Sequence, residues 1–323
     1  MRRSLSIPSL PVMQAPGSGK NSRPLLNRVH LFGLRITFSN SRPELHATVG
    51  NEVTEKRFIV FGAGSNQLLS AAVFALSPEN TTSPARVVAS VPYYMLNKEQ
   101  TQYYSSAKFE FDGHAYTWRN RSDASSTNMI ELVTSPNNPD GQLKQAVLHG
   151  PNVKTIYDRA YYWPHYTPIP APADEDVMVF TLSMLTGHAG TRLGWAVIED
   201  ETVFNRMTTH MHVNSLGMSK DAQLRAFRLL KAVLEEVTEI FDFAYKTMKS
   251  SKVRQLSQGT SLNLTSMPGT YRGHLYRYPT PFYLYILDLN NLMVTAAYAW
   301  LKCEREEDED CFAVLEAANI VGC

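Results

Sequence analysis

Short apolar runs alternate with stretches of helical spacing along most of the chain from about residue 45. The run at 58–61 ends in Gly-Ala-Gly-Ser, and residues 67–76 then place apolar side chains on one face of a helix that Ser77-Pro78 ends. Further apolar runs, each bounded by Pro, Gly, Asn or Asp, lie at Val87–Val91, Ile130–Val133, Thr155–Tyr157, Val177–Phe180 and Gly194–Ile198. This alternation predicts an α/β fold, with a large domain whose mainly parallel sheet is flanked by helices.

A long amphipathic helix is predicted between Ser219 and Phe243, because apolar residues keep three-and-four spacing there. We expect it to link a large domain, residues 44–245, to an incomplete smaller α/β domain, residues 246–323, that is truncated at its C-terminus. Residues 1–43 carry seven basic side chains and no acidic one, a bias typical of a disordered tail, a misassigned start or a transit peptide.

The charge balance and the cysteine count exclude several classes of function. Thirty-one basic and 30 acidic side chains leave a formal charge of +1, so nucleic acid is not an expected partner. The three cysteines are too few and too widely spaced for a disulfide framework or a zinc site, which favours reduced thiols in a cytoplasmic protein. Asp288 and Asn290 interrupt the apolar run at 283–301, so we expect no membrane span. His210 and His212 lack a third ligand, so we expect no metal.

Three segments place reactive or binding side chains directly after predicted strands. Residues 62–67, Gly-Ala-Gly-Ser-Asn-Gln, open a helix whose backbone amides favour an anion, although any tight strand-to-helix turn has the same pattern. Residues 135–141, Ser-Pro-Asn-Asn-Pro-Asp-Gly, place an Asn pair where α/β sheets bind ligands, but these residue types also form ordinary turns. Asp158 ends a third strand near Tyr161, and a carboxylate there needs a partner to offset its desolvation.

Together with a third motif, these segments resemble a known family. The runs Ser-Pro-Asn-Asn-Pro-Asp-Gly from Ser135, Asp-x-x-Tyr-Tyr-Trp-Pro-His-Tyr-Thr-Pro from Asp158 and Thr-Gly-His-Ala-Gly-x-Arg-x-Gly-Trp from Thr186 occur in order. Over roughly residues 44–245 the chain resembles the plant alliinase and tryptophan aminotransferase-related group of fold-type-I pyridoxal-phosphate enzymes. The resemblance implies a fold-type-I aminotransferase-like domain, a pyridoxal 5'-phosphate cofactor, amino-acid and 2-oxo-acid substrates, and a dimer. Residues 248–293 do not show it.

The resemblance also implies roles for individual residues. Asp158 matches the residue that pairs with the cofactor's ring nitrogen, while Asn138 and Tyr161 match those that hydrogen-bond the ring hydroxyl. Tyr94 matches the aromatic residue that stacks on the ring. The remaining expected contacts are with the phosphate, from the amides of Gly64, Ser65 and Asn66 and from the side chains of Ser183 and Arg192. We interpret His188, in the third motif, as a structural residue rather than an acid or base.

One position departs from the family, because its Schiff-base lysine aligns with Met184. That amine holds the cofactor covalently and moves the Cα proton of the substrate, and a thioether does neither. The nearest lysines in sequence, Lys154 and Lys220, lie outside the motif. The cofactor is therefore expected to be held non-covalently at most.

Two functions remain open at this point. The first is an aminotransferase, moving the amino group of an amino acid such as tryptophan to a 2-oxo acid, or a carbon-sulfur lyase, in either case impaired by Met184. The second is a non-catalytic binding or dimerisation partner, either a homodimer or a heterodimer with a family member.

Overall fold

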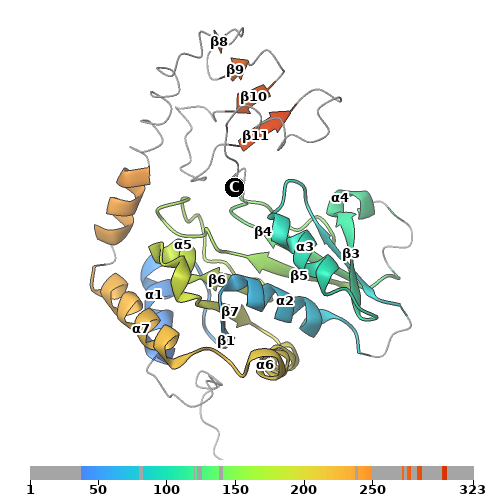
Figure 1. Cartoon of the computed structure of the whole chain (residues 1–323), viewed down its shortest axis with the longest axis horizontal. Helices are drawn as coiled ribbons and strands as arrows, with labels where there is room; N and C mark the ends of the chain where they lie inside the picture. Colours follow the sequence, from blue (N-terminus) through green and yellow to red (C-terminus); the bar gives the residue numbers. More distant parts are fainter. Residues whose placement is uncertain are drawn as a thin grey trace, which may run out of the picture.

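The computed structural model describes residues 38–79, 83–119, 121, 126–137, 141–236 and 239–248, and four short strands between residues 271 and 303. A seven-stranded sheet in the order β1-β7-β6-β5-β4-β2-β3 forms the centre of the main part (Figure 1). β2 to β6 run parallel, whereas β7 is antiparallel to both β6 and β1. The strands are β1 Phe58–Gly62, β2 Ala85–Ala89, β3 Phe109–His114, β4 Met129–Thr134, β5 Val153–Asp158, β6 Val177–Thr181 and β7 Gly194–Ile198.

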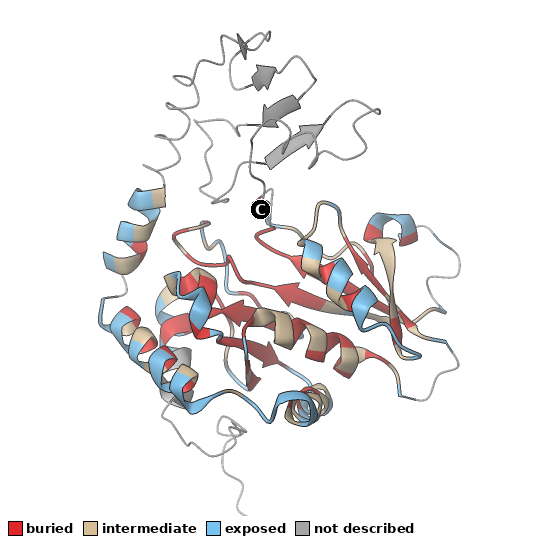
Figure 2. Cartoon of the chain, viewed as in Figure 1, coloured by how far each residue is buried: buried red, intermediate tan, exposed pale blue. Residues whose placement is uncertain are grey.

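Helices cover both faces of this sheet, and the strands between them are buried (Figure 2). Side chains alternate along β1, so that Val60 packs with α2 and α6 on one face while Ile59 packs with α1 and α7 on the other. This three-layer arrangement is the expected solution for a parallel sheet, because both of its faces need cover. The helices are α1 Phe38–Val49, α2 Ser65–Leu76, α3 Met95–Tyr103, α4 Ala115–Trp118, α5 Leu182–Thr186, the 3-10 helix η2 Ala189–Thr191, α6 Glu201–Ser215 and α7 Lys220–Glu235.

The second sheet lies within the predicted small domain. It is four-stranded and antiparallel, in the order β11-β10-β9-β8. Its strands are β8 Tyr271–Arg272, β9 Leu275–Arg277, β10 Phe282–Tyr285 and β11 Trp300–Cys303. The domain boundaries at residues 43 and 245 remain predictions, and α1 begins before the first of them.

The α/β fold and each strand predicted in the main domain are confirmed, with ends that shift by a few residues. The single helix predicted over 219–243 is wrong. α7 ends at Glu235, because Glu236 leaves the helical region with φ −132°, and residues 239–248 form a separate helix. The pattern did not predict β3, nor the helices α1, α3, α4, α5, η2 and α6. Within the described residues, no helix is long and apolar enough to cross a membrane.

Candidate functional site

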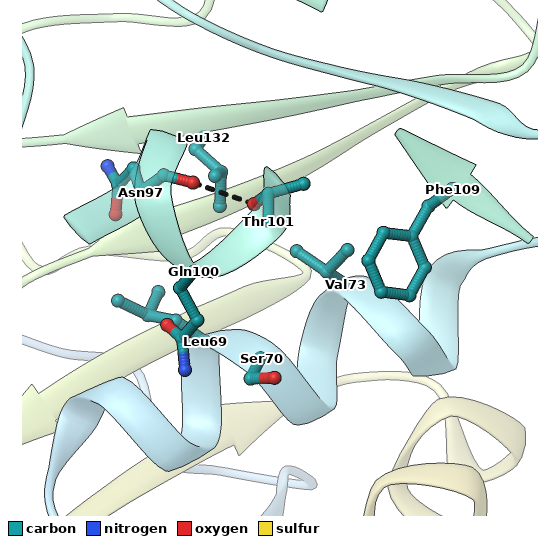
Figure 3. Close-up of a pocket in the computed structure, with 8 residues that line it drawn as sticks. All are labelled: Leu69, Ser70, Val73, Asn97, Gln100, Thr101, Phe109 and Leu132. Carbon is teal, nitrogen blue, oxygen red and sulfur yellow. Dashed lines mark hydrogen bonds between the residues drawn. The ribbon is translucent and has the colours of Figure 1, made fainter. Parts of the chain in front are cut away.

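A cavity of about 160 Å³ lies at the carboxyl ends of β4, β5 and β6, beside the first turn of α2. Open α/β sheets bind their ligands at this edge. Its walls are formed by Ser65, Asn66, Tyr94, Thr134, Asp158, Ala160, Tyr161, Thr181, Ser183, Met184, Ala189 and Arg192. A second cavity, between α2 and α3 (Figure 3), measures about 10 Å³ and has room for one water molecule at most. The larger cavity is therefore the candidate site.

Strand pairing brings distant parts of the chain to this edge. In β7, Gly194 pairs with Thr181 of β6 on one side and with Gly62 of β1 on the other. The loop between β6 and β7 and the start of α2 therefore meet. A Cβ atom on Gly194 would lie 2.9 Å from the backbone nitrogen of Ser65, so only glycine allows this approach.

The loop between β6 and β7 is fixed mainly by its backbone. The hydroxyl of Thr181 caps α5 by accepting a hydrogen bond from the Ser183 nitrogen at 3.2 Å, and Gly187 ends the helix in the left-handed region with φ 74°. His165 Nε2 donates to the carbonyl of Met184 at 3.1 Å. Burial lowers the pKa of His165 to about 4, so this imidazole is neutral at physiological pH. The side chain of Met184 is left to line the cavity.

One end of the cavity is suited to an anion. α2 begins after Gly64 without any side-chain cap on its first amides, and Ser65 and Asn66 from this first turn face the cavity. Arg192 lies against Gly64, so close that a Cβ atom there would be 2.9 Å from the guanidinium carbon. Its Nη1 donates to the carbonyl of Ala189 at 3.1 Å. The fixed guanidinium and the free amides together favour a phosphate-like group.

The other end of the cavity, at the end of β5, carries a buried carboxyl group that is suited to a cation. Asp158 is 6% exposed, and its Oδ1 accepts a hydrogen bond from the Ala160 nitrogen at 3.0 Å. Burial raises the pKa of this carboxyl to about 6, although the Ala160 amide and the Arg159 guanidinium oppose that shift. A cationic group in the cavity would offset the desolvation of the carboxylate and lower its pKa again.

Two tyrosines complete the walls between these ends. Tyr94 immediately precedes α3, and the segment leading to it is held at the carbonyl of Pro92, which accepts hydrogen bonds from Asn137 Nδ2 at 2.9 Å and Lys144 Nζ at 2.7 Å. Tyr161 packs edge-on against Tyr166, with ring centroids 5.0 Å apart. The cavity therefore has aromatic walls suited to a planar ring.

The structure brings most of the predicted site residues together. Ser65, Asn66, Tyr94, Asp158, Tyr161, Ser183, Met184 and Arg192 line one cavity, and Gly64 touches Arg192 beside it. Asn138 lies outside the described residues. His188 is exposed, with its Nδ1 3.1 Å from the hydroxyl of Thr186, and does not line the cavity. The roles given to these residues stay predictions.

Sequence reasoning missed some lining residues, namely Thr134, Ala160, Thr181 and Ala189. Their positions at strand ends or inside the recognised motifs were the available signal. No lysine is among the described residues that line the cavity. The described residues also contain no group of three or more His, Cys, Asp or Glu able to hold a metal ion.

Comparison with known proteins shows which family the chain resembles. The protein family described as Allinase matches residues 37–323, so the likeness also covers residues 248–293, where the sequence motifs had not shown it. Tryptophan aminotransferase-related protein 3 of Arabidopsis thaliana is 46% identical over 286 residues, which cover 86% of this chain and 59% of that protein. An alliin lyase of Allium cepa var. aggregatum is 39% identical, with coverage of 86% and 62%. The chain thus spans about six tenths of the length of these relatives.

Solved structures show the same fold at low sequence identity. An Escherichia coli protein with a methionine aminotransferase function superposes with a TM-score of 0.53 at 13% identity, covering 76% of this chain and 68% of that one. Cystalysin of Treponema denticola, which contains a pyridoxal 5'-phosphate cofactor, gives 0.53 at 14%, with coverage of 71% and 64%. The chain therefore belongs to the alliinase and tryptophan aminotransferase-related family and has its fold-type-I aminotransferase-like fold.

Proposed function

We propose that this chain binds pyridoxal 5'-phosphate non-covalently in the candidate cavity and has the site of an aminotransferase with impaired catalysis. The observation that carries the proposal is the pairing of two unlike ends in one cavity. A buried carboxylate lies at the end of β5, and uncapped amides with Arg192 lie at the start of α2. A planar ligand with a cationic ring nitrogen and a phosphate complements both ends.

The residues present fit the cofactor by several independent features. Gly64 has φ 85° and lies against Arg192, so a side chain at this position would fill the anion end. Asp158 is buried and lacks a charged partner inside the cavity among the described residues, so a cation there would relieve its desolvation. The volume between these ends is lined by Tyr94 and Tyr161.

Each residue then has a definite task when the cofactor is bound. The cofactor supplies an electron sink for charge that develops at the substrate Cα. Asp158 holds a proton on the ring nitrogen, the α2 amides and Arg192 orient the phosphate, and Tyr94 covers the ring against water. Met184 stands where the family pattern places its lysine, and its thioether has no proton to move and no amine to attach.

The names of the relatives support a proposal for the substrate class. Their names point to amino transfer from an amino acid such as tryptophan to a 2-oxo acid, or to carbon-sulfur cleavage of the kind carried out by alliin lyases. We favour amino transfer, because the relative with 46% identity is related to tryptophan aminotransferases.

A second candidate function is favoured by Met184. A subunit that keeps the fold and binds the cofactor, but lacks the amine, could pair with a second copy or with an active family member without catalysing a reaction itself. Size-exclusion chromatography of the chain alone and mixed with a catalytically active relative tests this idea. A chain that stays monomeric in both would remove the partner function.

The cofactor proposal is tested by titrating the purified protein with pyridoxal 5'-phosphate and following absorbance and tryptophan fluorescence. We expect saturable binding that dialysis reverses, with no lysine modified after borohydride treatment and mass spectrometry. Binding of pyridoxal without its phosphate should be much weaker. A cofactor fixed by borohydride to any lysine of the wild-type chain would refute the non-covalent mode.

Met184→Lys is the complementary variant. It returns the amine to the cavity, so borohydride treatment should then attach the cofactor at position 184. Met95→Lys is the matched control, because Met95 is 61% exposed on α3 and does not line the cavity. If both variants behave like the wild type while the wild type still binds the cofactor, Met184 does not occupy the lysine position.

A further inference from the structure

Thr134 lines the candidate cavity at the end of β4, and neither the sequence motifs nor the roles above use it. The residue is 4% exposed. Among the described residues, its Oγ1 has no hydrogen-bond partner. Buried hydroxyl groups in folded proteins nearly always have one, so a partner must come from the cavity's contents or from a neighbour that changes its rotamer.

The neighbour on the adjacent strand is Asp158. β4 and β5 are parallel, and Thr134 is the register partner of Asp158. Register partners in a parallel pair project from the same face of the sheet, on strands about 4.8 Å apart. The carboxylate Oδ1 already accepts from the Ala160 nitrogen at 3.0 Å, whereas Oδ2 has no hydrogen-bond partner among the described residues. A change of the Thr134 χ1 rotamer is the smallest movement that can direct the hydroxyl toward it.

Resting on the proposed cofactor site, we propose that Thr134 is a positioning residue. Its hydroxyl donates to Oδ2 of the ionised Asp158 carboxylate and so holds that carboxylate toward a cationic ring nitrogen. Thr134 does not touch the reacting atoms in this arrangement. It acts through Asp158, because a hydrogen bond to the charged form favours ionisation against the desolvation that opposes it.

Four other charged or titratable residues lie near Asp158 in the described part of the chain, and none of them occupies Oδ2. Arg159, the next residue in the chain, favours ionisation of the carboxyl through its charge. Arg192, Tyr94 and Tyr161 line the same cavity. None of them donates a hydrogen bond to Asp158 in the described structure, so the Thr134 hydroxyl has an acceptor available.

The test compares Thr134→Val, which keeps the shape and removes the hydroxyl, with Thr134→Ser, which keeps the hydroxyl. Thr155→Val on β5 is the matched control, because Thr155 does not line the cavity. The first measurement is the pKa of the Asp158 carboxyl in the ligand-free protein, from the pH dependence of its ¹³C NMR shift. Losing one hydrogen bond to a charged group should raise this pKa by about one unit in Thr134→Val, and leave it unchanged in the other two variants.

The second measurement is the affinity for pyridoxal 5'-phosphate at pH 7. It should fall about tenfold in Thr134→Val and hold in Thr134→Ser. In an Asp158→Asn background, Thr134→Val should cause no further loss, because the two residues act as one unit. A cofactor analogue with C–H in place of the ring nitrogen should bind wild type and Thr134→Val equally. If Thr134→Val does not fold, Thr134→Ala replaces it in both measurements.

Two results overturn the inference. An unchanged Asp158 pKa in the hydroxyl-free variant means that no hydrogen bond joins the two residues. A further loss of affinity in the Asp158→Asn background means that the hydroxyl contacts the ligand itself. The proposed function fails separately, if the wild-type protein does not take up pyridoxal 5'-phosphate. The titration of the Asp158 carboxyl needs no ligand. If the cofactor does not bind, this titration alone tests whether Thr134 donates a hydrogen bond to Asp158.

Discussion

Replacing Asp158 with Asn should stabilise the ligand-free protein and weaken cofactor binding at the same time. The amide has nearly the same shape and keeps an acceptor for the Ala160 nitrogen, so the change removes charge rather than packing. The pKa of Asp158 is raised to about 6 from an ordinary value of 3.8. Between these values the folded protein binds more protons than the unfolded chain, so the free energy of unfolding falls as the pH rises.

The size of this effect follows from the two pKa values. A shift from 3.8 to about 6 corresponds to about 3 kcal/mol of destabilisation of the ligand-free protein above pH 6, absent below about pH 4. Asp158→Asn carries no charge at any pH. It should therefore be more stable than the wild type by up to about 3 kcal/mol at pH 8 and equal to it near pH 4.

Urea unfolding of the cofactor-free protein at pH 4.5, 6 and 8 measures the difference. Asp242→Asn is the control, because Asp242 is exposed, and its curve should follow the wild type. In parallel, the affinity of Asp158→Asn for pyridoxal 5'-phosphate should fall at least about tenfold, because the charged partner of the ring nitrogen is lost. A stability difference that is the same at all three pH values, or an Asn variant less stable than the wild type at pH 8, would refute the reasoning.

Three other predictions follow from single contacts. Gly64→Ala places a Cβ atom against Arg192 at a position with φ 85°, so the affinity of the site for phosphate, measured by competition with the cofactor, should fall at least about tenfold. Gly190→Ala is the control, because there is open space around Gly190, and its affinity should not change. Glu131→Ala removes the buried carboxylate that accepts hydrogen bonds from two backbone N–H groups at 2.9 to 3.1 Å, and urea unfolding should show a free energy of unfolding lower by about 3 kcal/mol. Glu131→Gln keeps an acceptor and should retain most of the wild-type stability. His165→Phe removes a hydrogen-bond donor to α5 and should lower the free energy of unfolding by about 1 kcal/mol at pH 7. Because the pKa of His165 is lowered to about 4, the wild-type protein loses stability as the pH decreases from 6.5. Urea unfolding should therefore show a difference between the two proteins that shrinks or reverses at pH 4.5.

How far the sequence predicts this fold depends on how its elements are buried. The strands at the centre of the sheet are buried on both faces, so β6 is found from its apolar run alone, and β4 from a run that only Glu131 interrupts. β3 lies at the sheet edge with only Phe109 buried, and α6 carries His, Asn and Thr on most of its surface, so neither gives a clear pattern. A residue such as Thr134 reads as part of an apolar strand, and only the fold shows that it is the register partner of Asp158 and lines the same cavity.

The site can keep its shape with a methionine at position 184, because the contacts that fix the loop among the described residues do not use that side chain. Thr181 caps α5 through its hydroxyl, Gly187 ends the helix, and His165 binds a backbone carbonyl. The shape of the cavity therefore does not depend on the residue that would form the covalent bond to the cofactor. If the link is missing, all affinity for the cofactor must come from the charged ends of the cavity and the rings between them. Binding should then weaken with salt, and it should also weaken as the pH falls below about 6 and Asp158 becomes protonated. Lysine at position 184 would lessen both dependences, because a covalent bond adds retention that ions do not screen.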